Sequence, residues 1–225
     1  MQNIEFRRGV IKPIECLREA WEIIKPDYWL LFAILLVGAV IGAISLYILI
    51  GAMICGINYC YLRKIDGMPF TFDDLWKGFS WFGPGLIVAL CIFVPMFIVY
   101  GIIYAPVIAS VAMGQHMSQN ELLSFIIGAL AVDAVFVVIM VCFHTLLMFS
   151  FQLIVDKNFG AFKAMLTSAK AVWNNLGGVG GLILINFGLA LLGELAFCVG
   201  IYLVIPVMFA THLVAYRKVF PAQAL

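Results

Sequence analysis

The fold is decided by an uncharged stretch, residues 28–62, which reads YWLLFAILLVGAVIGAISLYILIGAMICGINYCYL. A membrane-spanning helix needs about 20 apolar residues, so this stretch is too long for one ordinary span. A single crossing would place Arg63, Lys64 and Lys77 on the opposite side of the membrane from the basic N-terminal region. A reversal near residues 47–51 would keep all of these residues on one side. We therefore predict two short spans joined by a turn.

The basic residues of the chain fall into four short stretches, all outside the apolar blocks. They are Arg7, Arg8, Lys12, Arg18 and Lys25; Arg63, Lys64 and Lys77; Lys157, Lys163 and Lys170; and Arg217 and Lys218. Basic residues that flank membrane spans stay on the cytoplasmic side. The pattern therefore predicts that all four stretches, and both termini, are cytoplasmic.

The composition is that of a membrane protein. The chain has 225 residues, of which 65% are hydrophobic and 11% charged, and its mean hydropathy is +1.12. A soluble domain has about 45–50% apolar and about 25% charged residues. The net charge of +1, with basic residues only at membrane flanks, does not predict nucleic-acid binding. The N-terminus lacks the pattern of a cleavable signal peptide, so the first apolar block is expected to be retained.

Four more spans are predicted at residues 84–112, 122–155, 176–193 and 195–216. Of the connections between them, residues 113–121 and Glu194 contain no Lys or Arg, as expected outside the cell. The stretch 122–155 is over-long and is expected to tilt, kink or begin in the interface. The predicted fold is all-α and polytopic: a single membrane domain, residues 1–225, with six transmembrane helices in three hairpins. Its three units are residues 8–62, 70–155 and 156–218.

Each predicted hairpin follows a cytoplasmic stretch with amphipathic helical spacing. The apolar stripes are Ile11, Ile14, Leu17, Trp21 and Ile24; Phe72, Leu75, Trp76 and Phe79; and Phe159, Phe162, Leu166, Ala169 and Trp173. Thr71 and Asp74 predict a capping box, and residues 83–85, Gly-Pro-Gly, predict the end of the second stretch. Such helices lie flat at the headgroup level. The pattern fits either a threefold repeat or flat helices that merely occur between spans.

Intramembrane polar residues are the first candidates for function, because each needs a partner in hydrocarbon. The candidates are Asp133, His144, Asn186 and Gln152 within the membrane, Asn58 and His212 near the inner interface, and Glu194 near the outer interface. Counting along the helices places His144 and Asn186 at one depth, where they could hydrogen-bond. Asp133, near the outer interface, His144 and Gln152 would form a polar line along the fourth span. That line fits either a proton or ion path or ordinary helix-packing contacts.

No motif in the sequence predicts a cofactor, a metal site or an enzyme. His144 lacks a second His at its depth to bind haem, and no zinc, nucleotide or nucleophile motif is present. The six cysteines are expected to be free thiols. The Gly38-x-x-x-Gly42 motif and the glycines at 177–188 predict either close helix packing or, for the second group, an unwound helix start.

Several short stretches resemble an uncharacterised family of bacterial polytopic membrane proteins. They are Gly56 to Phe79, with Arg63-Lys64, residues 69–75 (PFTFDDL) and Gly78-Phe79; Val155-Asp156, Ala164, Ser168 and Trp173-Asn174; and Pro206 with Ala215-Tyr216-Arg217. The family includes the YciC-like proteins and the membrane domain found fused to some glycerophosphodiester phosphodiesterases. The resemblance implies a six-helix domain of the bacterial inner membrane without known catalytic residues. The phosphodiesterase is a separate domain in those fusions, so no activity carries over.

The sequence therefore predicts a non-enzymatic inner-membrane protein, either an accessory or scaffold subunit or a lipid-contacting module. Its expected partners are membrane lipids, with a possible protein partner on the cytoplasmic amphipathic helices or the glycine-rich helix faces. A small transporter or channel using the polar line is the alternative. A membrane-embedded enzyme is the third hypothesis.

Overall fold

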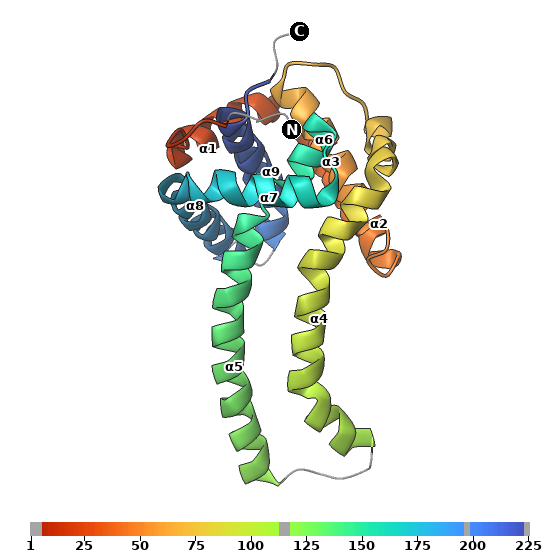
Figure 1. Cartoon of the computed structure of the whole chain (residues 1–225), viewed down its shortest axis with the longest axis vertical. Helices are drawn as coiled ribbons and strands as arrows, with labels where there is room; N and C mark the ends of the chain where they lie inside the picture. The colour runs from red at the N-terminus through yellow and green to blue at the C-terminus, as the bar shows by residue number, and fades with distance from the viewer. Residues whose placement is uncertain (1–5, 113–117, 196–198, 223–225) are drawn as a thin grey trace. The chain divides into compact units, whose positions relative to one another are not determined.

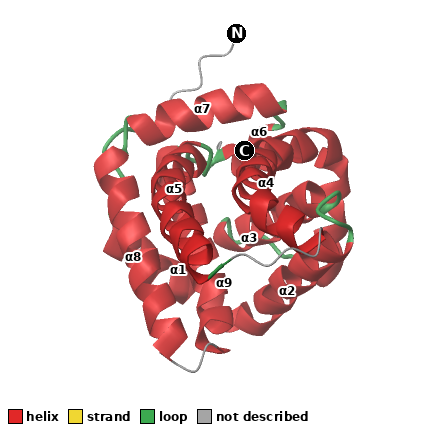
Figure 2. Ribbon diagram, turned by 90° about the horizontal axis from the view of Figure 1, so that it is seen from below, coloured by secondary structure: helices red, strands yellow, loops and turns green. Residues whose placement is uncertain are grey.

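The computed structural model describes residues 6–112, 118–195 and 199–222, and within these ranges it contains helices and no strand (Figure 2). The elements are α1 (Pro13–Ile24), η1 (Lys25–Asp27), α2 (Tyr28–Ile44), α3 (Ile50–Ile65), η2 (Phe72–Trp81), α4 (Phe82–Ala112), α5 (Gln119–Leu146), α6 (Ser150–Lys157), α7 (Ala161–Trp173), α8 (Leu176–Leu195) and α9 (Val199–Val219) (Figure 1). In the described residues, five helical segments are long and apolar enough to cross a membrane. They are Pro13–Ile44, Phe72–Ala109, Gln119–Lys157, Leu176–Leu195 and Gly200–Val219. The chain is thus an all-helical protein whose apolar helices indicate several membrane crossings.

The helices form two compact units. The first comprises Met1–Val88 and Leu146–Leu225, and the second comprises Ala89–Thr145. Helix α4 begins in the first unit and continues into the second. The prediction of one membrane domain with three sequential units stays a prediction.

The uncharged stretch at residues 28–62 forms two helices, α2 and α3, which pack against each other. The chain reverses at residues 45–49, where Leu46 and Tyr47 have positive φ angles of 50° and 65°. Ser45 stabilises the turn: its hydroxyl donates to the Gly42 carbonyl at 2.9 Å and accepts from the Leu49 amide at 3.1 Å. Helix α3 has 16 residues and is not among the five candidate spans. Its crossing of the membrane therefore stays a prediction.

Helix α3 is largely enclosed within the first unit. Nearly every residue from Gly51 to Leu62 is buried, and its neighbours include α2, η2, α6 and α9. Two glycines allow this crowding. A Cβ on Gly56 would lie 2.0 Å from the Leu75 carbonyl oxygen in η2, and one on Gly51 would lie 2.4 Å from the Gly85 backbone in α4. Close approach through small residues is how helices associate in lipid, where the hydrophobic effect supplies no drive.

Helix α6 and the C-terminal half of α9 supply a further part of the core of the first unit. Phe149, Tyr216 and Phe220 pack together, with ring centroids 5.2–6.2 Å apart. All three side chains are fully buried. They anchor the end of α9 against the turn that precedes α6.

The predicted fourth span, residues 122–155, is not one continuous helix. Helix α5 ends at Leu146, and α6 begins at Ser150. A break of this kind leaves backbone groups without helical partners. Ser168 of α7 satisfies two of them, because its hydroxyl donates to the Leu146 carbonyl at 2.7 Å and accepts from the Phe149 amide at 3.0 Å.

The second predicted amphipathic stretch also ends differently from the prediction. The capping box is confirmed, with Thr71 and Asp74 bonded reciprocally at the start of η2. However, residues 83–85 do not terminate the segment, because η2 runs directly into α4 at Phe82. Pro84 lies in the first turn of α4. Backbone amides in this turn have no intrahelical acceptor, so the amide hydrogen that proline lacks is not needed there.

The glycine and cysteine predictions are largely settled. A Cβ on Gly38 or Gly42 would collide with Ile57 or Ile50 of α3, and one on Gly178 or Gly181 would collide with residues 11 and 13. These four glycines therefore serve packing, and α8 is helical from Leu176 onward. Cys16, Cys55, Cys60, Cys91 and Cys142 are free. Cys198 lies outside the described residues, as do residues 113–117 of the predicted external connection.

The second unit consists of the later part of α4 and most of α5. The two helices contact through aromatic pairs, Tyr100 with Phe136 at 6.0 Å and Tyr104 with Phe125 at 6.4 Å between ring centroids. Most other large apolar side chains of this unit are exposed. This is the surface expected of helices whose solvent is lipid.

Candidate functional site

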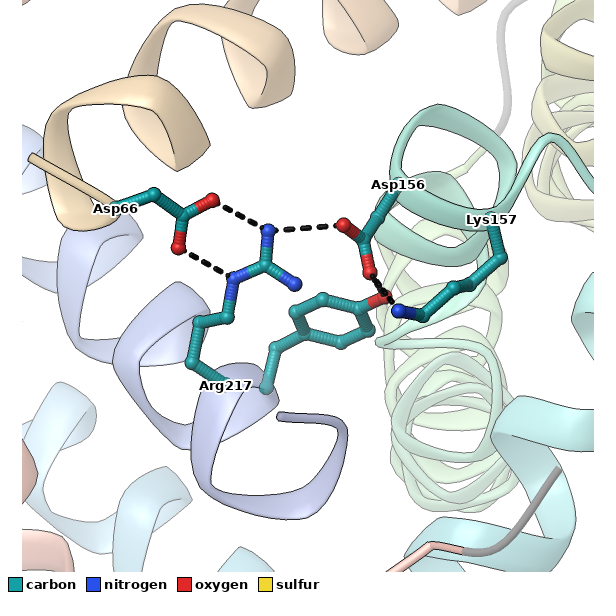
Figure 3. Close-up of polar contacts among 5 residues, drawn as sticks. Asp66, Asp156, Lys157 and Arg217 are labelled. Atoms are coloured by element: carbon teal, nitrogen blue, oxygen red, sulfur yellow. Dashed lines mark hydrogen bonds and ion pairs between the residues drawn. The ribbon is translucent and has the colours of Figure 1, made fainter. Parts of the chain in front are cut away.

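The most extensive polar cluster joins the ends of three helices in the first unit (Figure 3). The Arg217 guanidinium of α9 binds Asp66, which follows α3, in bidentate fashion: Nε lies 2.8 Å from Oδ1 and Nη2 lies 2.6 Å from Oδ2. The same Nη2 donates to Asp156 Oδ1 of α6 at 2.9 Å. We call Asp66, Asp156, Lys157, Tyr216 and Arg217 the arginine cluster.

Charge within the arginine cluster is balanced. Tyr216 donates its hydroxyl to Asp156 Oδ2 at 2.7 Å, and Lys157 lies 3.2 Å from the same oxygen. Two carboxylates therefore face two cations. The charged side chains are only 12–16% exposed, and Arg217 Nη1 is buried without a hydrogen-bond partner.

The arginine cluster holds elements together, and it shows no arrangement for catalysis. Asp66, Asp156 and Arg217 come from separate elements, so the cluster fixes where α3, α6 and α9 end relative to one another. Both carboxylates are fully engaged with cations, which leaves neither free as a general base. Among the described residues, no group of three or more His, Cys, Asp or Glu could hold a metal ion.

Two predicted polar residues form a second buried contact in the first unit. Asn58 of α3 and Gln152 of α6 are both almost completely buried. The Gln152 amide nitrogen donates to the Met148 carbonyl at 2.9 Å, and the Gln152 amide oxygen faces the Asn58 side-chain amide, 3.3 Å away. Asn58 also donates to the Ile54 carbonyl of its own helix at 2.8 Å. The pair joins α3 to α6 inside the protein.

Asn186 and His212 form a third pair. The sequence predicts His144 as a possible partner for Asn186, but the structure places the Asn186 amide nitrogen against His212 Nε2. Helices α8 and α9 pack along each other, which brings the two side chains together. Asn186 Oδ1 is buried without a partner. Glu194, the predicted outer-interface acid, is exposed at the end of α8.

His144 and Asp133 both lie on α5 in the second unit. His144 Nε2 is 3.4 Å from the Ile92 carbonyl of α4, in the turn before Pro95. Asp133 Oδ1 is buried without a hydrogen-bond partner. Because α5 ends at Leu146, Asp133 lies 13 residues from that end, about 20 Å along the helix, and Gln152 is on a different helix. The predicted line of three residues therefore does not follow one helix.

The three stretches that the sequence predicts to be cytoplasmic share an unusual distribution of side chains. In α1, Cys16, Ala20 and Ile24 are buried, whereas Ile14 and Trp21 are exposed. In η2, Leu75 and Gly78 are buried, and Trp76 and Phe79 are exposed with their rings stacked. In α7 the buried residues are Ala161, Ala164, Ser168, Ala171 and Val172. The exposed ones in α7 include Phe162, Leu166 and Trp173, each 64–69% exposed.

The predicted apolar stripes are thus divided between two environments. Ile11, Ile24, Leu75 and Phe159 pack into the protein, and the larger part of the stripes lies on the surface. A helix on a soluble protein buries its large apolar side chains and exposes its small and polar ones. In α1, η2 and α7, by contrast, large apolar side chains are exposed on the side that faces away from the protein.

The arginine cluster is not apparent from the sequence, in which Arg217 and Lys157 are only topological markers and Asp66 has no predicted role. One signal was available: Asp156, Tyr216 and Arg217 all lie in the short motifs that carry the family resemblance. Comparison of the chain with protein-family models, with curated proteins and with solved structures finds no match in any of the three.

Proposed function

We propose that this chain is a non-enzymatic protein of the bacterial inner membrane, an accessory or scaffold subunit that contacts lipid through its cytoplasmic side. In this proposal it belongs with the YciC-like membrane proteins. Helix α3 is the second of six spans, arranged as three hairpins with both termini in the cytoplasm. The segments α1, η2 and α7, which we call the collar, each precede one hairpin and lie in the inner headgroup region.

The observation that carries the proposal is the exposed apolar face of the collar. Trp21, Trp76 and Trp173 are 40%, 45% and 68% exposed, on three separate segments. Leaving such side chains in water costs about 25 cal/mol for each Å² of apolar surface. Aromatic rings are favoured at the membrane–water boundary, where one edge meets headgroups and the other meets acyl chains.

Charged residues beside this face fit the same location. In α7, Lys163 and Lys170 are exposed next to the apolar stripe that contains Phe162 and Leu166. Long basic side chains can extend from an apolar surface to reach phosphate groups. Each basic residue near an anionic leaflet contributes about 1 kcal/mol of attraction.

The experiment is depth-dependent fluorescence quenching in liposomes. Single-tryptophan variants retain Trp21, Trp76 or Trp173 and replace the other four tryptophans with Phe. Lipids brominated near the headgroup should quench each of them more strongly than lipids brominated near the chain end. A matched control variant, Leu184→Trp in a background without other tryptophans, places the ring on the exposed face of α8 and should show the opposite order.

Collar tryptophans that are quenched by aqueous acrylamide and not by either brominated lipid would contradict the proposal. Purification in mild detergent gives a second test, since an accessory or lipid-contacting protein should retain a partner or bound lipid. A monodisperse monomer without a bound partner or lipid would count against both the scaffold role and the lipid-contacting role.

A small transporter or channel is the second candidate, and one observation favours it. Asp133 carries a buried carboxylate oxygen without a partner in the middle of α5. Unpaired carboxylates inside membranes are typical of proton and ion pathways. Proton-coupled flux that disappears in Asp133→Asn and His144→Ala, with expression unchanged, would favour this candidate over the scaffold.

A further inference from the structure

We propose that a cavity between the start of α2 and the loop after α3 binds the phosphoethanolamine headgroup of a membrane lipid. This inference rests on the proposed lipid-contacting function and names the lipid class. The cavity has a volume of about 450 Å³, and its walls include Asp27, Leu30, Lys64, Met68 and Phe70. Small-molecule sites in proteins are typically about 300–1,000 Å³, so the space is sufficient.

The cavity lies where a lipid headgroup would be. Asp27 immediately precedes α2, whose apolar sequence begins at Tyr28, and Lys64 lies in the last turn of α3. Trp29, in the first turn of α2, is 70% exposed. A cavity that holds two charged side chains at the ends of two apolar helices, beside an exposed tryptophan, fits the level of the membrane interface.

The charges in the cavity match a zwitterion. Lys64 and Asp27 form an ion pair there, and no other lining residue is charged. The Asp27 side chain is 42% exposed and the Lys64 side chain 20% exposed, so both are accessible. The ligand exchanges this ion pair for two others: its phosphate binds the Lys64 ammonium, and its own ammonium binds the Asp27 carboxylate. The net charge of the two residues is zero, which gives no preference for an anionic lipid.

The donor chemistry distinguishes ethanolamine from choline. A primary ammonium offers three N–H donors to the Asp27 carboxylate. A quaternary ammonium offers none and is usually held by several aromatic faces. Phe70 is the one aromatic residue among those that line the cavity. The site therefore favours phosphatidylethanolamine over phosphatidylcholine.

The loop that forms the cavity wall is fixed in place before any ligand binds. Gly67, at φ +70°, ends α3 in a Schellman motif, with hydrogen bonds from the Gly67 amide to the Lys64 carbonyl at 3.1 Å and from the Met68 amide to the Arg63 carbonyl at 2.8 Å. Arg63 Nε donates to the Pro69 carbonyl at 2.7 Å. Asp66 is held by Arg217, so it does not compete for the ligand ammonium. A preorganised wall reduces the ordering cost of binding.

The test is native mass spectrometry of the full chain released from micelles that contain equal amounts of phosphatidylethanolamine, phosphatidylcholine and phosphatidylglycerol. We expect the wild type to retain phosphatidylethanolamine preferentially. Asp27→Asn and Lys64→Gln should each weaken its retention roughly tenfold, as expected when one charge-assisted contact is lost. Glu22→Gln and Lys25→Gln are matched controls, since these exposed residues lie outside the cavity and should leave retention unchanged.

Leu30→Trp gives a variant that keeps both charges and fills the cavity, and it should also abolish the preference. If a charge variant fails to fold, Leu30→Trp still tests whether the lipid headgroup occupies this cavity. Soluble glycerophosphoethanolamine, added as a competitor, distinguishes a free ligand from a lipid: displacement at low concentration would overturn the assignment to a membrane lipid. Equal retention of the three lipids by the wild type, or equal losses in the control variants, would overturn the headgroup site. Lipid retention without selectivity would leave the lipid-contacting function standing, and absence of all bound lipid would contradict both.

Discussion

Arg217 shows how a single residue can connect several parts of a membrane protein. One guanidinium binds two carboxylates that come from different helix ends, Asp66 and Asp156. Planar, bidentate binding of this kind is specific to arginine. The sequence shows the charge of Arg217 and not its partners, because Asp66 and Asp156 are 90 residues apart in the chain and meet only after folding.

Replacing Arg217 with Gln is expected to lower the free energy of unfolding by about 3–5 kcal/mol, because it leaves two buried carboxylates without their main counter-charge. Chemical unfolding in mixed micelles measures the change. Arg18→Gln, an equal change at an exposed position of α1, should have an effect below about 0.5 kcal/mol. Adding Asp66→Asn to Arg217→Gln should restore part of the loss, and no restoration would mean that the carboxylates are not the source of the instability.

The helices show which structural features can be read from the sequence. The apolar blocks, the reversal in residues 28–62 and the capping box at Thr71 and Asp74 follow from hydropathy, charge placement and local spacing. The break between α5 and α6 does not, since residues 141–155 contain no proline or glycine. It depends on the Ser168 hydroxyl, which comes from a different helix. Pairing of polar residues, such as Asn186 with His212, was also missed because it depends on how helices pack.

The break at residues 147–149 should therefore depend on Ser168. Ser168→Ala leaves the Phe149 amide and the Leu146 carbonyl without their partner, and we expect a loss of about 1–3 kcal/mol of stability. Ser80→Ala, at an exposed position of η2, is the control. Ser168→Thr keeps the hydroxyl and should lose less than Ser168→Ala; equal losses would mean that packing, and not hydrogen bonding, is responsible.

The packing of α3 against η2 depends on the absence of a side chain at Gly56. In Gly56→Ala the new Cβ would lie 2.0 Å from the Leu75 carbonyl oxygen, a backbone atom that cannot rotate away. The two elements must separate, so we expect a lower midpoint of thermal unfolding and a smaller folded fraction. Gly180→Ala is the control, because its Cβ meets nothing within 4 Å and should be neutral or stabilising by about 0.5–1 kcal/mol. Similar behaviour of the two variants would contradict the close contact.

At the scale of the whole molecule, the role of α3 determines the topology. With 16 residues it is about 24 Å long, shorter than the roughly 30 Å hydrocarbon core of a bilayer. The first unit nevertheless encloses α3 with other helices, and the basic residues at its end match those at the N-terminus. If α3 crosses, the chain has six spans and both termini on one side; if it does not, the termini lie on opposite sides.

Two cysteine positions at the ends of α3 separate these possibilities. In a variant without native cysteines, Ile48→Cys places a thiol in the exposed turn before α3, and Met68→Cys places one in the exposed loop after it. We expect a membrane-impermeant maleimide to label Ile48→Cys in intact spheroplasts, whereas Met68→Cys should react only after the membrane is opened. The basic residues Arg63 and Lys64 beside the second position would otherwise have to be moved across the membrane, against the charge rule. Labelling of both positions from the same side would show that α3 returns without crossing, and would reduce the chain to the five spans that its helix lengths alone support.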